Sequence, residues 1–460
     1  MKISTTLLRQ LYIVIVVNLS SVGLGLTMAW NSPMLYKLMY EDTQLSHRIT
    51  SSDASWIVSI GYLAAIFFCP LTSWVLDPMG RKLCLLAFGT IRATLGLILV
   101  FGTEVWMLLV ARAINGIFEI GILMILPSYC VEISSKEIRG ALGTISQMAS
   151  SVGMLIMFGF GPFLSYLNVN IIYVVALYAT VIPLLFVPDS PYSLLRKGLK
   201  DEAFEVLKLL RGSEIAAQQE LKEMTVVHGC QVKVKDLLKD RIFLKALSIS
   251  VLLSIGFQLI GYSAVTVYLQ SIMDITKTSV SSNTISVIFG VMQIIASLVS
   301  ALLSDKAGRK IILCVTLFGT AIGMAGLGLF FYANDSSDSI VGFMNYLPIV
   351  SVIIIVLCYN AGMGSLCILV CTELFDSPAR TTSVSISVSS SLIFAFLNLK
   401  YFPLLSELMG AAAVFWSFSA INLLYVLFIM FCVPETKRKS FLEIQRALGR
   451  REDKKEAVCA

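Results

Sequence analysis

The chain has 460 residues, of which 57% are hydrophobic and 14% are charged, and its mean hydropathy is +0.83. Soluble domains are about half apolar and a quarter charged, so this composition excludes an ordinary soluble protein and indicates that lipid is the solvent for much of the surface. The net charge of +6 would favour nucleic acid as a partner of a soluble protein, but here we expect none, because the basic residues follow a membrane topology.

Apolar segments long enough to cross a bilayer recur along the whole chain. A helix needs about 20 apolar residues to cross the hydrocarbon, and by that measure the sequence predicts twelve spans. They fall near 11–31, 55–76, 83–102, 105–127, 140–163, 168–188, 243–270, 281–303, 310–332, 346–371, 383–405 and 412–433. We therefore expect an all-α membrane protein with the lipid bilayer as its first partner.

Lysine and arginine indicate how the spans are oriented, because both are enriched in cytosolic loops. If both termini are cytosolic, 29 of the 35 basic residues lie in inside segments and 4 lie in outside segments. The glycosylation sequon at Asn334 then lies in an outer loop, as its modification requires. A multi-pass protein with two cytosolic termini is expected.

One long polar stretch, 190–242, separates the sixth span from the seventh. Within it, Asp201 to Met224 has the pattern of an amphipathic helix. The expected organisation is an N-terminal six-helix bundle over 1–189, a cytosolic helical linker over 190–242, a C-terminal six-helix bundle over 243–433 and a cytosolic tail over 434–460.

Three short motifs occur twice, in the same order. The first reads DPMGRK at 77–82 and DKAGRK at 305–310, the second places an arginine seven residues after a glutamate at 132 and again at 373, and the third reads VPDS at 187–190 and VPET at 433–436. Three collinear pairs indicate an internal duplication, and each set lies at cytosolic helix ends.

The repeated charges are expected to form a gate on the cytosolic side, where ion pairs between the bundles lock the protein and break when that side opens. The alternative is that the basic residues only anchor the topology. The predicted gate residues are Asp77, Arg81, Arg112, Glu132, Arg139, Asp305, Arg309, Glu373 and Arg380.

Charged residues inside spans are also informative, because an arginine at a helix centre costs at least about 2.5–3.5 kcal/mol in lipid. Arg92, Arg112 and Glu119 must therefore face protein or water. We expect Arg112 in the inner half, within the gate. For Arg92 and Glu119 a structural pair between adjacent helices is expected, with a role in the pore as the alternative.

Taken together, these motifs resemble the sugar porter family of the major facilitator superfamily over essentially the whole chain. The resemblance is carried by RAING at 112–116, PSYCVE at 127–132, RGALG at 139–143 with Gln147, the two Asp-to-Arg motifs and PETK at 434–437. The segment from Gly25 to Pro33, which ends in AWNSP, is more similar to the insect facilitated trehalose transporters than to vertebrate glucose carriers.

The resemblance implies alternating access, in which two bundles rock around a site at the midplane. Amide side chains would meet the sugar hydroxyls, because an amide both donates and accepts hydrogen bonds. The implied substrate-binding residues are Gln147, Gln258, Ser263, Gln293, Tyr359 and Asn360. Gly362 and Gly364 would let helix 10 bend.

Several positions depart from the family pattern. Phe257 stands where the family has the first of two glutamines, and Ser263 replaces the usual asparagine. Helix 10 reads GMGSLCI over 362–368, so both prolines and the tryptophan of the family motif are absent. The scaffold is therefore closer to the family than the pocket is, which leaves the solute open.

The source of energy is predicted from what the first span contains. From Leu11 to Pro33 there is no acid, base or histidine, whereas proton-coupled sugar porters carry an acid on this helix. No phosphate-binding loop of the G-x-x-x-x-G-K-[ST] form occurs either. Facilitated diffusion is expected, and Glu119 is the residue through which a proton would otherwise be coupled.

We therefore expect a monomeric carrier in the plasma membrane that moves a sugar, trehalose or a hexose, by facilitated diffusion. The alternatives are a nutrient sensor that transports weakly and a carrier of a non-sugar polar solute. An enzyme is not expected, because no set of nucleophile and base is evident. Neither a cofactor nor a bound metal is expected.

Overall fold

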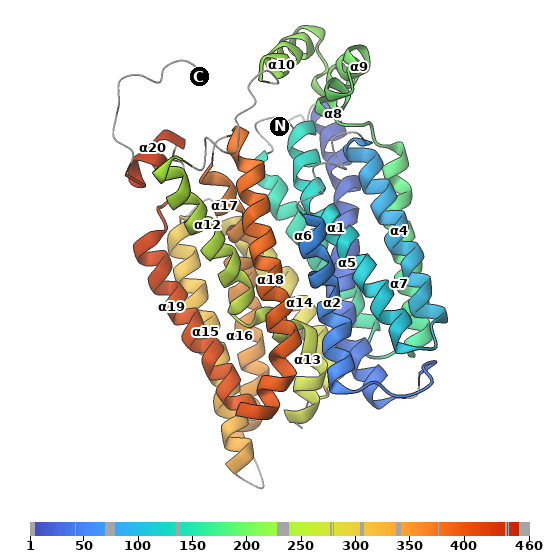
Figure 1. Ribbon diagram of the computed structural model, residues 1–460, viewed down its shortest axis with the longest axis vertical. Coiled ribbons are helices and arrows are strands. Elements are labelled where there is room, and N and C mark those ends of the chain that lie inside the picture. The colour runs from blue at the N-terminus through green and yellow to red at the C-terminus, as the bar shows by residue number, and fades with distance from the viewer. Residues whose placement is uncertain are drawn as a thin grey trace.

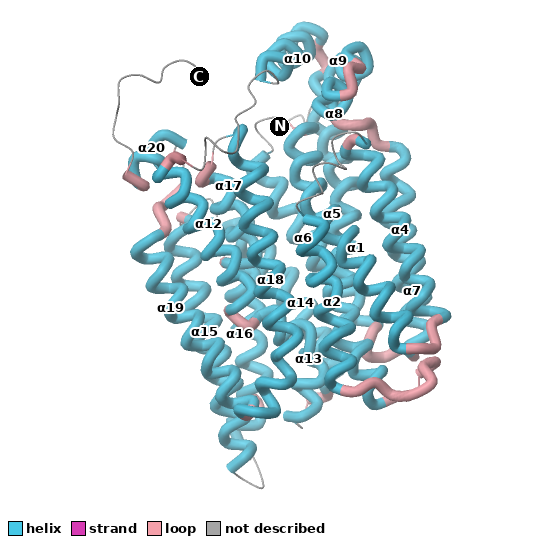
Figure 2. The backbone as a smooth tube through the Cα atoms, in the orientation of Figure 1, coloured by secondary structure: helices cyan, strands magenta, loops and turns pink. Residues whose placement is uncertain are grey.

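The computed structural model describes residues 5–41, 43–69, 79–134, 139–227, 239–276, 278, 280–303, 308–336, 342–375, 377–437, 439 and 441–449. Throughout these residues the regular structure is helical (Figure 2). Among them are 11 helices long and apolar enough to cross a membrane, together with the shorter apolar helix Ile145–Phe160. These match the twelve expected spans in order, so the prediction of an all-α membrane fold is confirmed.

The N-terminal half contains six long helices. They are α1 (Thr5–Tyr40), α2 (Ser51–Phe68), α4 (Arg81–Phe101), α5 (Val105–Ile133), α6 (Arg139–Phe160) and α7 (Tyr166–Val181), the last continued by the short helix η2 (Ile182–Phe186). The first helix is longer than expected at both ends, because polar residues continue the helix beyond the apolar stretch.

The linker forms α8 (Pro191–Arg196), α9 (Lys200–Arg211) and α10 (Glu214–Val227). The single amphipathic helix expected from Asp201 to Met224 is therefore wrong. Gly212 ends α9 in the left-handed conformation, with φ of 69°, which glycine adopts without a steric penalty. Apolar periodicity does not reveal such a break.

The C-terminal half contains α12 (Arg241–Leu259), α13 (Tyr262–Thr276), α14 (Ser282–Leu303), α15 (Arg309–Ser336), η3 (Gly342–Asn345), α16 (Leu347–Ala361), α17 (Met363–Glu373), α18 (Ser377–Met409), α19 (Ala411–Cys432) and α20 (Phe441–Ala447). Two of the spans expected to be continuous are interrupted. The seventh breaks at Ile260 and Gly261, and the tenth breaks at Gly362.

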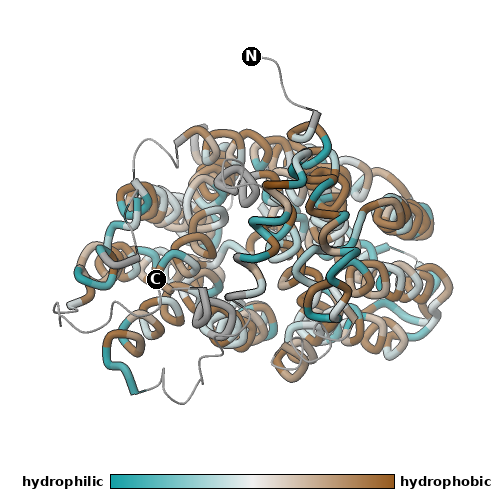
Figure 3. Tube along the Cα trace, turned by 90° about the horizontal axis from the view of Figure 1, so that it is seen from above, coloured by the Kyte–Doolittle hydropathy of each residue, from teal (hydrophilic) through white to brown (hydrophobic). Residues whose placement is uncertain are grey.

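The two halves lie side by side with their helices roughly parallel to one long axis (Figure 1). Their most extensive contacts are between α6 and α14, between α2 and α18 and between α1 and α13. Seen along the helices, most of the ribbon is apolar (Figure 3). Phe101, Phe186 and Phe431 are 76%, 77% and 80% exposed, which fits side chains that face lipid.

Candidate functional site

A polar cluster joins the two halves at the middle of the molecule. Gln147 on α6 donates from Nε2 to Oδ1 of Asn360 on α16 over 3.2 Å. Gln293 on α14 donates to the same oxygen over 3.5 Å. Asn360 in turn donates from Nδ2 to the Tyr262 hydroxyl over 3.1 Å. Three of the expected binding residues are thus brought together from both halves, and Asn360 is their common partner.

An aromatic wall lies beside this cluster. The rings of Tyr359 and Tyr262 stack with their centroids 3.5 Å apart. Phe257 packs against Tyr359 at 5.5 Å, and Phe289 stacks on Tyr262 at 6.2 Å. The sequence analysis placed Tyr359 in the site and missed Tyr262. Tyr262 follows directly after the helix break at Gly261, which the sequence does not reveal.

Gln258 and Ser263 lie on either side of the helix break. The Ser263 hydroxyl donates to Oε1 of Gln258 over 3.0 Å, and Asn398 donates to the backbone oxygen of Gln258 over 2.7 Å. Both side chains are buried. These hydrogen bonds stabilise the chain on both sides of the helix break. A solute that bound Ser263 or Oε1 of Gln258 would replace the hydrogen bond between them.

The central cluster can take up hydroxyl groups. Oε1 of Gln293 is buried and has no hydrogen-bond partner among the described residues. A buried polar atom without a partner is costly, so a donor placed there by a solute would be favoured. The amides supply donors and acceptors, and the aromatic wall supplies an apolar face. This combination suits a polyhydroxylated ring.

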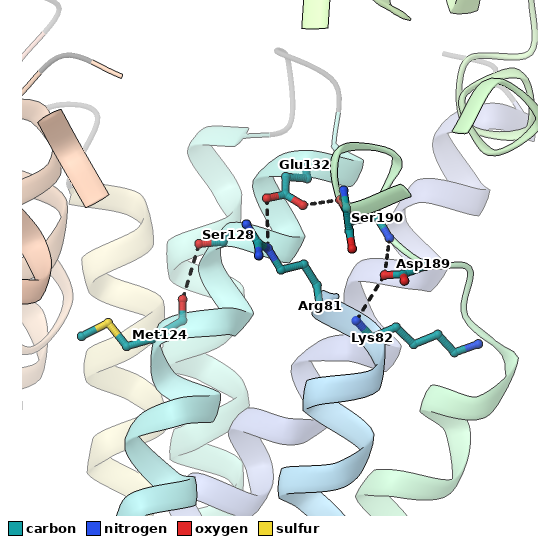
Figure 4. Close-up of polar contacts among 8 residues, drawn as sticks. Arg81, Lys82, Met124, Ser128, Glu132, Asp189 and Ser190 are labelled. Atoms are coloured by element: carbon teal, nitrogen blue, oxygen red, sulfur yellow. Dashed lines mark hydrogen bonds and ion pairs between the residues drawn. The ribbon is translucent and has the colours of Figure 1, made fainter. Parts of the chain in front are cut away.

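At the linker end of the N-terminal half, Arg81 pairs through Nε with Glu132 at 3.3 Å. Ser190 donates to the other oxygen of Glu132, so both groups point at one carboxylate (Figure 4). Asp189 accepts from the backbone N–H of Lys82 over 3.3 Å. Gly80, just before α4, has φ of 87°, a conformation that only glycine adopts readily.

The C-terminal half repeats this arrangement. Arg309 pairs through Nη2 with Glu373 at 3.4 Å. Glu435 accepts from the backbone N–H groups of Arg309 and Lys310 over 3.0 and 3.1 Å, and Gly308 has φ of 92°. The third motif of each repeat thus supplies an acid that caps the start of a helix, a role that the sequence analysis did not assign.

Capping also changes the acidity of Glu435. Burial alone would raise the pKa of this carboxyl group. Hydrogen bonds from the backbone N–H groups of Lys437, Arg309 and Lys310 favour the charged form and outweigh burial, so the pKa lies below its ordinary value.

Comparison with known proteins agrees with this geometry. The family model described as sugar (and other) transporter matches residues 15–448. The chain belongs to this transporter family. It is 29% identical over 446 residues to the facilitated trehalose transporter Tret1 of Polypedilum vanderplanki, covering 95% of this chain and 88% of the relative. It is also 29% identical to Tret1 of Culex quinquefasciatus, over 94% and 84%.

Solved structures show the same fold. The transporter superposes on a partially occluded inward open conformation of the xylose transporter XylE from E. coli with a TM-score of 0.78, at 21% identity, covering 94% of this chain and 99% of that one. XylE bound to 6-bromo-6-deoxy-D-glucose gives 0.76 at 20% identity, covering 95% and 99%. The major facilitator fold is thereby confirmed, and the chain is a transporter, not an enzyme.

The ion pairs of the two repeated motifs, Arg81 with Glu132 and Arg309 with Glu373, each lie within one half of the transporter. Asp77 and Asp305 lie outside the described residues. The side chains of Arg139 and Arg380, at the starts of α6 and α18, are also outside the described part. A contact between the halves at this end therefore stays a prediction.

Arg112 lies in the half of α5 away from the linker end, where the repeated ion pairs lie, which corrects its assignment to the gate with them. It lies seven residues after Val105 and 21 residues before Ile133, or about 10 Å from one end of α5 and about 31 Å from the other. Ile133 is at the linker end of the molecule, because Arg211 of α9 donates to its oxygen over 3.0 Å. Proximity to the family motif in sequence misled the prediction.

The neighbours of Arg112 also differ from the prediction. Its Nη2 donates to Oδ1 of Asn31 on α1 over 3.1 Å, and its guanidinium lies 3.9 Å from the centre of the Trp30 ring. Arg92 donates to Asn115 over 3.0 Å and to Thr27 over 2.7 Å, in place of the expected pair with Glu119. Arginine–amide contacts of this kind depend on helix rotation, which span prediction does not give.

On the side away from the linker, polar contacts join the two halves. Lys400 on α18 donates to the Ser55 hydroxyl of α2 over 2.8 Å and lies 4.1 Å from the centre of the Trp56 ring. The backbone N–H of Gln270 on α13 donates to the Ser32 hydroxyl of α1 over 3.0 Å. We call these contacts the outer latch. The sequence analysis did not predict the outer latch, and it counted Lys400 only as one of the four basic residues in outside segments.

Proposed function

We propose that this transporter moves a sugar by facilitated diffusion, with trehalose as the first candidate. The observation that carries the proposal is the central cluster of Gln147, Gln293, Asn360 and Tyr262, which belongs to both halves and offers donors, an unpaired acceptor and an aromatic face. The chain belongs to the sugar transporter family, and relatives of it are named facilitated trehalose transporters. Both findings support a sugar carrier over a nutrient sensor.

The contact of Arg112 supports diffusion without a coupled proton. A proton-coupled carrier needs a titratable group that changes its pairing as solute binds. The group that faces Arg112 from the first helix is Asn31, whose amide does not titrate. Glu119 is an intramembrane acid that could couple a proton in another mechanism, but facilitated diffusion requires no such role of it.

Alternating access follows from where the halves touch. The outer latch joins the halves, whereas the recorded cytosolic ion pairs each stay within one half. In the proposed cycle the latch opens when the cytosolic side closes, and Arg81, Glu132, Arg309 and Glu373 then contact the opposite half. Asp77, Arg139, Asp305 and Arg380 are proposed to join them. Bending at Gly362, with Gly364 beside it, would accompany this change.

The cellular setting is part of the proposal. The helix α15 begins at Arg309, on the cytosolic side, and ends at Ser336, so Asn334 lies at the opposite end, as glycosylation requires. The start of α1 and the short helix α20 lie at the same end of the molecule as α8–α10 (Figure 1), which supports two cytosolic termini. We propose a monomer in the plasma membrane, with 1–189 and 243–433 as the two moving bundles.

Uptake into oocytes that express the chain tests this proposal. Radiolabelled trehalose and glucose are offered at external pH 5.5 and 7.5, with surface expression measured in the same cells. Saturable uptake of either sugar that is equal at both pH values is expected. Surface expression without uptake would refute sugar transport, and faster uptake at pH 5.5 would refute facilitated diffusion without a coupled proton.

A further inference from the structure

Two arginines share a small cavity inside the N-terminal half. Arg92 on α4 and Arg112 on α5 are 2% and 7% exposed. The rest of the cavity wall consists of apolar side chains of α4 and α5 together with Asn115 and Tyr173. The described residues that line it include no carboxylate. Two cations therefore face the same small cavity.

The hydrogen bonds of these guanidinium groups go to neutral partners. Arg92 donates to Asn115, Thr27 and the backbone oxygen of Gly23. Arg112 donates to Asn31, and its Nε is buried with no partner among the described residues. Neutral partners satisfy single N–H groups but do not balance charge, and a buried charge without an opposite charge is strongly unfavourable.

The nearby acid balances at most one of the two cations. Glu119 lies two helical turns from Arg112 on α5, within the electrostatic field of both arginines. No ion pair joins it to either of them in the described part of the chain, within the 4.0 Å that defines one. Two guanidinium groups and one carboxylate leave one positive charge over.

We propose that a single monovalent anion of the size of chloride binds between Arg92 and Arg112. It would accept the free Nε–H of Arg112 and neutralise the remaining charge. The cavity has a free volume of about 10 Å³, about the space of one water molecule. A chloride ion is somewhat larger, so the two flexible guanidinium groups would move apart slightly to admit it, and sulfate, phosphate and organic carboxylates are excluded. Binding of this anion is independent of which solute the transporter carries.

Thermal unfolding of the purified full chain in detergent tests the site directly. Sodium chloride is compared with sodium gluconate at equal ionic strength. A ligand that binds only the folded state raises Tm in proportion to its occupancy, so we expect a saturable rise of about 2 °C or more in chloride and in bromide. Arg92→Gln and Arg112→Gln should each abolish the rise. Arg9→Gln, which changes an exposed arginine, should retain it.

Bromide quenches tryptophan fluorescence, is close to chloride in size and gives a second readout that needs no arginine variant. Trp30 is fully buried and lies 3.9 Å from the Arg112 guanidinium, so only an anion held in this cavity would quench its fluorescence. We expect a saturable quenching component that chloride competes away and that Trp30→Phe removes. Equal Tm in chloride and gluconate with no such component would overturn the proposal and leave a water molecule in the cavity. A chloride effect that survives both glutamine variants would also overturn it.

Discussion

Lys400→Met is expected to open the outer side of the transporter. The substitution keeps a side chain of similar length but removes the hydrogen bond to Ser55 and the contact with the Trp56 ring. A hydrogen bond to a charged group is worth about 1.5–3 kcal/mol, and a cation–π contact about 0.5–1 kcal/mol where it is exposed. Lys400 is partly exposed, so we take the low values, which sum to about 2 kcal/mol, or about 30-fold in the equilibrium between outer-closed and outer-open forms.

Labelling from outside the cell measures this shift. Thr266 on α13 is buried and lies between the central cluster and the outer latch, so Thr266→Cys reports access from that side. With a maleimide that does not cross membranes, the reporter should react about ten-fold faster or more when Lys400→Met is added. Lys400→Arg keeps the charge and the aromatic contact and should leave the rate unchanged. Equal rates in the Lys400→Met and parent proteins would refute the latch.

Three further predictions concern the central cluster, Arg112 and Glu435. Asn360→Ala removes the acceptor of Gln147 and Gln293. The loss of about 0.5–1.5 kcal/mol of hydrogen bonding should raise KM for sugar uptake about 2- to 12-fold at unchanged surface expression. An unchanged KM would exclude Asn360 from the site. Asn31→Asp places a carboxylate beside Arg112, and the arginine keeps that carboxylate charged at pH 5.5 and at pH 7.5. The tighter pair should slow uptake by the same factor at both pH values, and uptake equal to that of the parent protein would count against this contact. The pKa of Glu435 is lowered, so its carboxylate stabilises the folded state above the ordinary glutamate pKa and loses that effect as pH falls through the lowered pKa. Glu435→Gln should therefore lower Tm more at pH 7 than at pH 4. An equal loss of Tm at both pH values would contradict the capping role.

Span positions and the two-fold repeat were predictable because lipid imposes strong constraints on composition. Apolar runs of about 20 residues and the distribution of basic residues reflect the thickness and sidedness of the bilayer. Short polar motifs at helix ends, such as DPMGRK and DKAGRK, survive because turns and caps need particular residues. These features are local in sequence, so they are visible without a structure.

Helix breaks and contacts between helices were less predictable. The interruption at Gly261 lies within an apolar run that looks continuous, and a bend at Gly362 was expected only from the resemblance to the family. The assignment of Arg112 to the gate failed because helix direction was not applied to its position on α5. The partners of Lys400 are 345 residues away in the chain, and no local pattern indicates them.

Within the candidate site, the resemblance to the family indicated Gln147, Gln293 and Asn360, and the structure brings these three together. It did not indicate how they are paired, because a substitution such as Phe257 changes the wall against which Tyr359 packs. Tyr262 joins the cluster only because the break at Gly261 turns the next helix toward Asn360.

Trehalose counterflow in proteoliposomes tests the central claim most directly. Purified transporter is reconstituted with unlabelled trehalose inside, and radiolabelled trehalose is added outside with no ion or pH gradient. A facilitative carrier exchanges one sugar for the other, so we predict a transient accumulation of label that unlabelled external trehalose competes away. If label enters no faster than into vesicles without protein, and glucose loaded in the same way gives the same result, facilitative sugar transport by this chain is contradicted.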